Sequence, residues 1–163
     1  MNINLQPFPI NELPDFIHAK TEALFKQSDF ALNLHLDTSL DNRLLNIDKD
    51  ALTQVIINLV DNAIKYSANQ EKRQVDISII DCSSQEVAIK VRDYGIGIAP
   101  QELSRIFDLF YRVGNELTRT SKGTGLGLTL VKELVKHMGG EISVVSCEIG
   151  TEIVVHLPSQ PND

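Results

Sequence analysis

The sequence DKDALTQVIINLVDNAIKYS, residues 48–67, decides the fold because its pattern predicts a long amphipathic helix. Asp48 is of a residue type favoured at helix N-caps, where a carboxylate accepts a hydrogen bond from a free amide of the first turn. Apolar residues then recur every three or four positions, at Leu52, Val55, Ile56, Leu59 and Ala63. This apolar stripe must pack against another layer of the protein.

The opposite face of this predicted helix carries the polar residues Gln54, Asn58, Asn62 and Lys65, which fall within a sector of about 100°. Asparagine forms helices less readily than glutamate or lysine, so two asparagines in mid-helix favour a role beyond solvation. Their amide oxygens suit magnesium beside phosphate oxygens, and Lys65 can offer a charge to a phosphate. An ordinary polar surface stripe is the alternative.

The flanking sequence predicts further helices and strands. Helical spacing predicts helices at 12–26 and 126–137, the second ended by Gly139-Gly140. Strands are predicted at 30–36, 43–47, 76–81, 86–92, 141–146 and 151–157. Short turns predict two hairpins, one of 76–81 with 86–92 and one of 141–146 with 151–157. The strand at 43–47 is the candidate hairpin partner of 30–36. This mixture predicts an α+β fold, a mostly antiparallel sheet with helices on one face.

Length and composition fit one soluble domain. We expect a leading segment at 1–11, the folded domain at 12–158 and a C-terminal tail at 159–163 of the 163 residues. No apolar run approaches the ~18 residues of a membrane span, so the domain is expected to be cytosolic in character. Cys82 and Cys147 lack metal-ligand spacing and are expected to be small, buried or half-buried side chains.

The net charge of −7, from 22 acidic and 15 basic residues without a basic cluster, argues against nucleic acid as a main partner. An acidic domain that binds a polyanion must supply local donors, and backbone amides and helix N-termini are the usual ones. This directs attention to the glycine-rich segments.

The first glycine-rich segment is DYGIGI, residues 93–98, which follows the predicted strand at 86–92. A carboxylate only accepts hydrogen bonds, so Asp93 would select an amine such as the exocyclic amine of adenine. A charge-assisted bond of this kind contributes about 1.5–3 kcal/mol. The dinucleotide fingerprint GxGxxG fails because position 100 is proline. A simple turn after a strand is the alternative.

The second glycine-rich segment is KGTGLGL, residues 122–128, which leads into the predicted helix at 126–137. Its glycines permit close backbone approach, and the helix N-terminus presents free amides to an anion. Lys122 stands where it could reach a terminal phosphate. A Walker A loop would need the lysine after the glycines, so that motif is excluded. A glycine hinge before a helix is the alternative.

In this order and spacing, these segments resemble the catalytic ATP-binding domain of bacterial two-component sensor histidine kinases. The superfamily also includes gyrase, the heat-shock-90 chaperones and the mismatch-repair ATPases. Residues 58–67 look like the N box, 93–98 and 123–128 like the two glycine boxes, and FDLFYR at 107–112 like the F box that opens an ATP lid. Gly150-Thr151 fits the final glycine turn, and the resemblance covers about residues 5–158. It implies a two-layer α/β sandwich with a mixed, mostly antiparallel five-stranded sheet and about three helices on one face.

The resemblance also implies a role for each motif residue. Asn58 and Asn62 would hold magnesium against ATP, Asp93 would bind the adenine amine, and residues 107–122 would cover the phosphates. The catalytic residues would be Asn58, Lys65, Arg112 and Lys122. The nucleotide would also contact Asn62, Tyr66, Asp93, Gly95, Gly97, Ile98, Tyr111, Gly123, Thr124, Gly125, Leu126, Gly127, Leu128 and Thr151.

The residue at position 58 bears on the reaction. Hydrolases of the superfamily carry a glutamate one turn before the metal asparagine as general base for water. Asn58 cannot accept a proton near pH 7, which favours phosphoryl transfer over fast hydrolysis.

The phosphate acceptor is expected on a different domain. Family members transfer to a histidine that is followed by an acidic residue and, a little later, a proline; the four histidines here lack that context, namely His18, His35, His137 and His156. The resemblance therefore implies a monomeric catalytic domain that serves a separate dimeric histidine hairpin and a downstream response regulator. It also implies a cytoplasmic location in a parent kinase anchored in the inner membrane.

Two other functions fit the same motifs. An anti-sigma factor of this fold phosphorylates serine and also lacks the histidine hairpin, although the full segment at 107–112 looks like the sensor-kinase type. A module that binds ATP without transferring phosphate is the third possibility.

Overall fold

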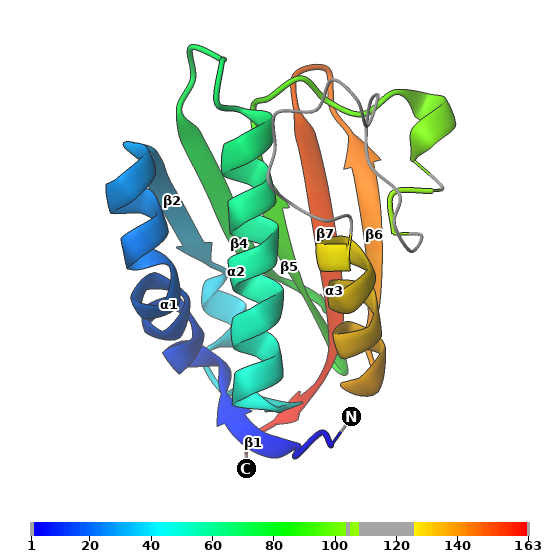
Figure 1. Cartoon of the computed structure of the whole chain (residues 1–163). Helices are drawn as coiled ribbons and strands as arrows, with labels where there is room; N and C mark the ends of the chain where they lie inside the picture. Colours follow the sequence, from blue (N-terminus) through cyan, green and yellow to red (C-terminus); the bar gives the residue numbers. More distant parts are fainter. Residues whose placement is uncertain (1, 104, 108–125, 163) are drawn as a thin grey trace.

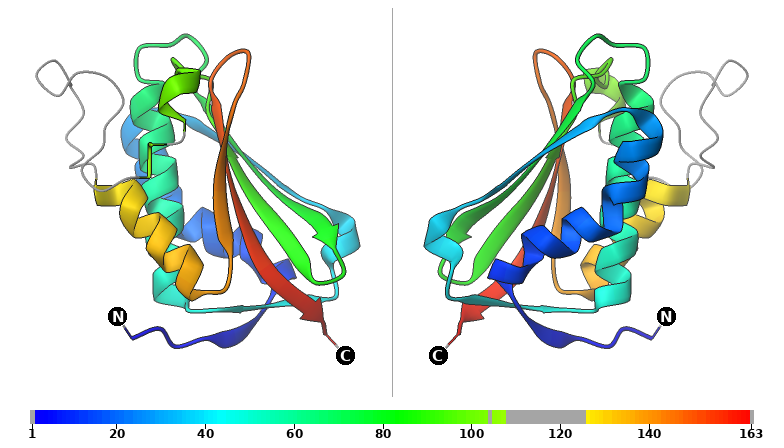
Figure 2. Two further views of the ribbon diagram at one scale, coloured as in Figure 1. Left: turned by 90° about the vertical axis from the view of Figure 1, so that its right-hand side faces the viewer. Right: turned by 90° about the vertical axis from the view of Figure 1, so that its left-hand side faces the viewer.

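In the described part of the chain, three α-helices pack on one face of a curved sheet to form two layers (Figures 1 and 2). The computed structural model describes residues 2–103, 105–107 and 126–162. The helices are α1 (Leu13–Ser28), α2 (Lys49–Tyr66) and α3 (Leu126–His137). The predicted α+β two-layer class is confirmed.

The sheet of the described residues has seven strands, two more than the five that we expected. They are β1 (Gln6–Pro9), β2 (Ala31–Leu36), β3 (Arg43–Ile47), β4 (Gln74–Ser83), β5 (Glu86–Arg92), β6 (Glu141–Ser146) and β7 (Thr151–Pro161). Their order is β1-β3-β7-β5-β4-β2, and β6 pairs with β7 beside β3. The pair of β2 and β4 is parallel and the others are antiparallel, so the sheet is mixed and mostly antiparallel as predicted.

Helix α2 forms as its sequence predicts. The side chain of Asp48 accepts a hydrogen bond from the amide of Ala51 (3.0 Å), which is the predicted N-cap. The predicted stripe is buried, since Leu52, Val55 and Ile56 have no exposed surface. It packs against the inner face of the sheet, where Ile77, Ile89 and Val155 are also fully buried.

The hairpin predicted between 30–36 and 43–47 is wrong. Strand β3 pairs instead with β1 and with the end of β7, while β2 lies parallel to β4. A 3₁₀ turn at Thr38–Leu40 separates β2 from β3, and Asp37 caps it by accepting a hydrogen bond from Ser39 (3.1 Å). The two parallel strands then need a long crossover, and α2 supplies it.

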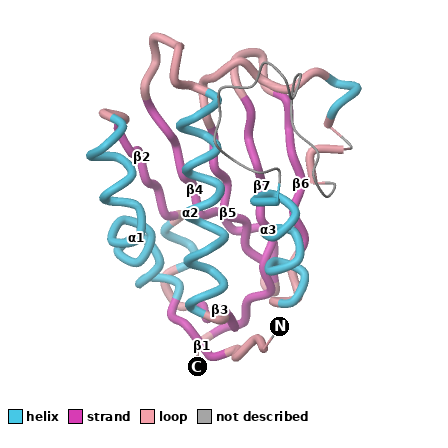
Figure 3. The backbone as a smooth tube through the Cα atoms, viewed as in Figure 1, coloured by secondary structure: helices cyan, strands magenta, loops and turns pink. Residues whose placement is uncertain are grey.

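The two other hairpins, β4 with β5 and β6 with β7, are confirmed. The predicted bounds of α3 at 126–137 are confirmed as well. The ends of the chain have more structure than their sequence indicates. Residues 6–9 of the predicted leading segment form β1, and β7 continues through Pro161 into the predicted tail (Figure 3).

Neither cysteine forms a disulfide. Cys147 is half-buried and free as expected, whereas Cys82, also free, is exposed because it lies near the end of β4. None of the helices in the described part of the chain has the length and apolar character needed to traverse a bilayer.

Candidate functional site

Asp93 lies immediately after β5 and is only 5% exposed. Its Oδ1 atom accepts hydrogen bonds from the backbone amides of Gly95 (2.9 Å) and Thr151 (3.2 Å). Burial raises the pKa of the Asp93 carboxyl, and these two hydrogen bonds and the charge of Arg92 offset part of the rise. The result is a buried carboxylate whose orientation is fixed by one amide of the loop after β5 and one amide at the start of β7.

The loop after Asp93 touches the end of α2. The amide of Ile96 donates to the carbonyl of Tyr66 (3.3 Å). A Cβ on Gly95 would run into the same carbonyl and would lie 3.0 Å from the hydroxyl of Ser67. Position 95 therefore requires glycine, and this contact joins the N-box helix to the first glycine-rich segment.

The turn between β6 and β7 packs against Asp93 on the side opposite α2. Gly150 has a φ of 85°, and a Cβ there would collide with the carbonyl of Asp93. The turn is held by a hydrogen bond from the amide of Cys147 to the carbonyl of Gly150 (3.2 Å). It delivers Thr151, which is 3% exposed, to the Asp93 carboxylate.

The polar face of α2 turns toward α3. The Nδ2 atom of Asn58 donates to the carbonyl of Gln54 (2.8 Å), one turn earlier in α2. Its Oδ1 atom faces Gly127, since a Cβ on that glycine would lie 3.2 Å from this oxygen. The half-buried Asn62 follows one turn later. These amide oxygens beside a helix N-terminus fit a magnesium ion that is shared with phosphate oxygens.

Lys65 does not stand alone on this face. Its ammonium group lies 2.7 Å from the carboxylate of Asp61, and the side chains are 32% and 36% exposed. The pair is an ordinary one between residues four apart on a helix. Phosphate would have to draw Lys65 away from Asp61 or bind both through water.

The structure places the remaining predicted residues only in part. Gly97, Ile98 and Leu128 are described, and the last two are 6% and 8% exposed. Leu126 begins α3. The predictions that fall on Tyr111, Arg112, Lys122, Gly123, Thr124 and Gly125 lie outside the described residues. Phe107, the first F-box residue, accepts a hydrogen bond at its carbonyl from Thr129 of α3 (3.0 Å).

The described residues thus form two groups along α2. Tyr66, Gly95, Asp93 and Thr151 meet at its C-terminal end, and Asn58 meets Gly127 two turns earlier. Eight residues separate Asn58 from Tyr66, which corresponds to about 12 Å along the helix. This separation suits a ligand with a flat base at one end and phosphates at the other.

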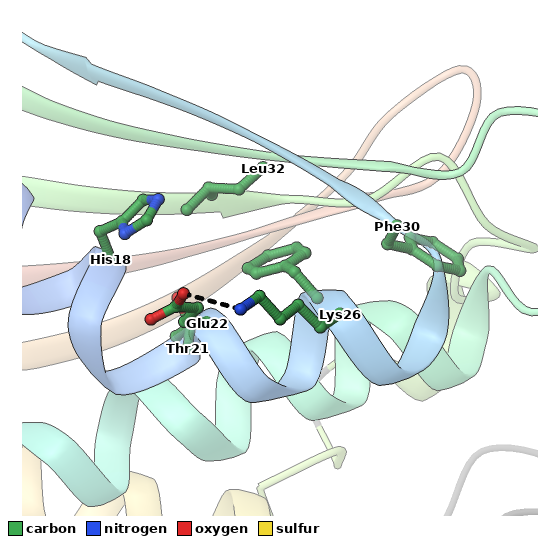
Figure 4. A pocket seen from close by; sticks show the side chains of 7 residues that line it. His18, Thr21, Glu22, Lys26, Phe30 and Leu32 are labelled. Carbon is green, nitrogen blue, oxygen red and sulfur yellow. Dashed lines mark ion pairs between the residues drawn. The ribbon is translucent and has the colours of Figure 1, made fainter.

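Two of the hollows that are lined by described residues lie near the sheet. A cleft of about 480 Å³ separates the 95–99 loop from the 146–150 turn, and the exposed Ile96 and Ile149 line it. A second hollow of about 310 Å³ lies between α1 and the start of β2 (Figure 4). Glu22 and Lys26 form an ion pair there (3.1 Å), and its lining includes none of the residues predicted to bind nucleotide.

The comparison with protein families agrees with this geometry. Residues 47–161 match the family described as "Histidine kinase-, DNA gyrase B-, and HSP90-like ATPase". The chain belongs to this family. The match contains α2, both glycine-rich segments and the Gly150-Thr151 turn, and so includes the described residues of the site.

Curated members of the family resemble the chain closely. It is 44% identical over 117 residues to the sensor histidine kinase WalK of Bacillus subtilis (strain 168), a match that covers 70% of this chain and 19% of the relative. It is 33% identical over 160 residues to the sensor protein SrrB of Staphylococcus aureus (strain NCTC 8325 / PS 47), covering 97% of this chain and 26% of the relative. The chain therefore spans about a fifth to a quarter of the length of these relatives.

Solved histidine kinase structures share the fold. The mycobacterial sensor histidine kinase MprB superposes with a TM-score of 0.78 and 25% identity over 97% of this chain and 99% of that chain. A nucleotide-free catalytic domain of the histidine kinase ThkA gives a TM-score of 0.77 and 26% identity with the same coverage. The chain is an ATP-binding catalytic domain of the sensor histidine kinase type.

The sequence did not indicate which residues flank and support Asp93. The guanidinium of Arg92 donates to the carbonyl of Ile149 (3.0 Å), and the hydroxyl of Tyr94 donates to Asp76. The hydroxyl of Ser67 is buried without a hydrogen-bond partner among the described residues. The alternation of β5 indicates only that Lys90 and Arg92 share the outer face of the sheet, so it could not reveal a backbone partner 57 residues away.

Proposed function

We propose that this domain binds magnesium-ATP and presents its γ-phosphate to a histidine on a separate domain of a sensor histidine kinase. The buried Asp93 carboxylate, fixed by Gly95 and Thr151 beside the N-box helix, carries the proposal. Membership of the family supports it.

Asp93 selects the base. Its carboxylate accepts hydrogen bonds only, so it pairs with the exocyclic amine of adenine and repels the carbonyl that guanine has at that position. The glycine backbone at 95 and 97, together with Ile98 and Tyr66, forms the walls of the base pocket. Thr151 contacts the base edge beside Asp93.

The phosphates lie between α2 and α3. Asn58 and Asn62 would hold a magnesium ion, which would supply positive charge to neutralise the phosphates. Lys65 approaches the phosphates after it exchanges Asp61 for a phosphate oxygen. The amides of 123–128 bind phosphate oxygens, and Tyr111, Arg112 and Lys122 contact the nucleotide from residues 107–122.

Transfer rather than hydrolysis is the reaction. An acceptor histidine nitrogen forms a bond to the γ-phosphorus as the bond to the β–γ bridging oxygen breaks, and ADP leaves. Asn58 stands where a water-activating carboxylate would be required and cannot take up a proton. The chain contributes positioning and charge neutralisation to this step. The acceptor hairpin, a response regulator and a parent kinase anchored in the inner membrane are the proposed partners and context.

Two measurements test the proposal. Calorimetry should show that ATP binds in the presence of magnesium and that GTP binds at least about tenfold more weakly, a difference of about 1.4 kcal/mol. The domain is then mixed with labelled ATP and a separately produced helical hairpin that carries a histidine, a following acidic residue and a later proline. Acid-labile label on that hairpin supports the kinase. Equal affinity for ATP and GTP would contradict the role of Asp93. In a parallel mixture with an antagonist protein in place of the hairpin, label on a serine of that protein would identify an anti-sigma factor instead.

A further inference from the structure

Arg92 is the last residue of β5 and directly precedes Asp93, yet the two side chains lie on opposite sides of the sheet. Arg92 pairs in register with Glu152 of β7 and with Asp76 of β4, whose side chains share its face. This is the face that the helices leave uncovered (Figure 2). Arg92 is half-buried there, whereas Asp93 is almost fully buried on the other side.

The guanidinium of Arg92 is directed at the β6–β7 turn. Its Nη2 atom donates to the carbonyl of Ile149 (3.0 Å), and its Cζ atom lies 4.7 Å from the centre of the Tyr94 ring. Its Nε atom is buried without a hydrogen-bond partner among the described residues. A buried donor without a partner costs free energy, so this position of the side chain needs other stabilising contacts. The hydrogen bond of Nη2 and the contact with the Tyr94 ring supply them.

The same turn is bound from the inside by the neighbouring residue. Thr151 follows Ile149 by two residues, and its amide donates to Oδ1 of Asp93 (3.2 Å). The last residue of β5 and the residue after it therefore hold one turn from its two sides, Arg92 through the carbonyl of Ile149 and Asp93 through the amide of Thr151.

We propose that Arg92 is a positioning residue of the base pocket, which holds the 147–150 turn so that the Thr151 amide stays on the Asp93 carboxylate. The proposal rests on the proposed function, because it assumes that Asp93 is the residue that binds adenine. Arg92 does not touch the ligand. It acts on the pocket in two ways, by holding the turn and by placing a positive charge near the Asp93 carboxylate.

Other residues of the outer face keep Arg92 in this position. The hydroxyl of Tyr94 donates to the carboxylate of Asp76, and the ammonium of Lys72 lies 3.8 Å from the centre of the Tyr94 ring. The ring thus contacts two cations, and its hydroxyl is bonded to Asp76. Arg92 rests on a ring that cannot turn away without breaking the bond to Asp76.

The charge of Arg92 has a second effect, on the protonation of Asp93. Burial raises the pKa of this carboxyl, the two backbone hydrogen bonds lower it, and the charge of Arg92 lowers it further. Removing the charge therefore leaves Asp93 protonated to a higher pH. A protonated Asp93 is a poorer acceptor for the adenine amine, so nucleotide affinity would then be lost at a higher pH.

The test compares Arg92→Gln and Arg92→Lys with Lys90→Gln as the matched control. Lys90 lies two residues earlier on the same face, where it forms an ion pair with Glu152 (3.9 Å). Its replacement removes the same charge without touching the turn. Hydrogen exchange of the Thr151 amide reports the turn without nucleotide, and calorimetry with ADP between pH 5 and pH 8 reports the pocket.

We expect Arg92→Gln to speed exchange of the Thr151 amide about tenfold, to weaken ADP binding about tenfold and to move the acidic limb of the binding profile to higher pH. Arg92→Lys should restore the profile because it keeps the charge, and Lys90→Gln should match the wild type. Equal Thr151 exchange in Arg92→Gln and Lys90→Gln would overturn the proposal. A wild type that binds no adenine nucleotide would contradict the proposed function, while the exchange of Thr151 would still report the action of Arg92 on the turn.

Discussion

The backbone amide of Thr151 donates a 3.2 Å hydrogen bond to the carboxylate of Asp93, a residue 58 positions earlier in the chain. The same oxygen accepts the amide of Gly95 (2.9 Å). Asp93 in turn donates its own amide to the carbonyl of Thr151 (2.9 Å). This reciprocal pairing fixes the one buried carboxylate of the described residues at the junction of the two strands that lead to it.

Asp93→Asn should abolish adenine-nucleotide binding and leave the fold intact or more stable at pH 7. An amide keeps an oxygen for Gly95 and Thr151 but removes the charge that burial disfavours. Because the pKa of Asp93 is raised in the folded state, its contribution to stability is present at low pH and is lost as the pH rises through that pKa. Calorimetry with ATP and thermal unfolding at pH 7 measure the two effects.

The control for this variant is Asp41→Asn, which changes an exposed acid that precedes β3. It should change neither ATP affinity nor the melting temperature. In a domain of this size, about 1 kcal/mol corresponds to roughly 2–4 °C. A large fall in the melting temperature of Asp93→Asn would contradict the view that the charge is retained for binding at the expense of stability.

Gly95→Ala should damage both stability and binding. The added methyl group would press on the carbonyl of Tyr66 at the end of α2, and backbone cannot give way as a side chain can. Overpacking of this kind costs about 1–3 kcal/mol. Chemical denaturation gives the free energy of unfolding, and calorimetry gives the affinity for ATP.

Gly127→Ala provides the comparison. Its Cβ would lie 3.2 Å from Oδ1 of Asn58, a side-chain atom that can shift by a few tenths of an ångström. We expect a small change in stability and a weaker effect of magnesium on binding. Equal losses of stability in the two alanine variants would show that the contact between Gly95 and Tyr66 is not the tighter one.

Asn62→Ala should remove most of the magnesium dependence of ATP binding. The loss of an amide oxygen leaves the ion with Asn58 and phosphate alone. The measurement is ATP affinity in magnesium and in chelator. Gln54→Ala, on the same face but one turn before Asn58, should keep the ratio of the wild type. An unchanged ratio in Asn62→Ala would exclude this residue as a ligand.

Tyr94→Phe should reduce the acid sensitivity of the fold. Burial alone would raise the pKa of Asp76, but hydrogen bonds from Tyr94, Gln74 and Asn33 and the charge of Lys72 bring it below its ordinary value. A depressed carboxyl pKa contributes stability above the unfolded pKa, and this stability is lost as the pH falls through the folded pKa. Removing the hydroxyl should cost about 1 kcal/mol near pH 7 and less near pH 3.

Melting temperatures between pH 3 and pH 7 test this expectation. The difference between Tyr94→Phe and the wild type should shrink as the pH falls. A difference that stays constant across the range would mean that Asp76 does not carry the effect.

Local patterns sufficed to predict much of the fold. An N-cap and a stripe of period 3.6 define α2, and short turns define the hairpins of β4 with β5 and β6 with β7. Strand β1 could not be predicted because Pro7 and Pro9 weaken its strand pattern, and its partner begins at Arg43. The partner of β3 is also set by distant residues, at the end of β7.

The candidate site also has one part that local motifs predict and one part that depends on distant contacts. The motifs predict Asp93 and Gly95 through their combination and order, because a glycine turn after a strand is common on its own. Arg92 has the appearance of any charged residue on the outer face of a strand. Its partner is a backbone carbonyl, and every residue has one, so the sequence contains no sign of the contact.

Strand β1 lies at the end of the domain that is far from the loop of Asp93. It pairs with β3, the amide of Asn4 donates to Asp48 at the start of α2 (2.8 Å), and both chain termini lie at this end in Figure 1. The loop of Asp93 meets the far end of the same helix, about 27 Å away for its 18 residues. A rotation of about 10° about the β1 end would therefore displace the far end of α2, where the loop of Asp93 lies, by about 5 Å.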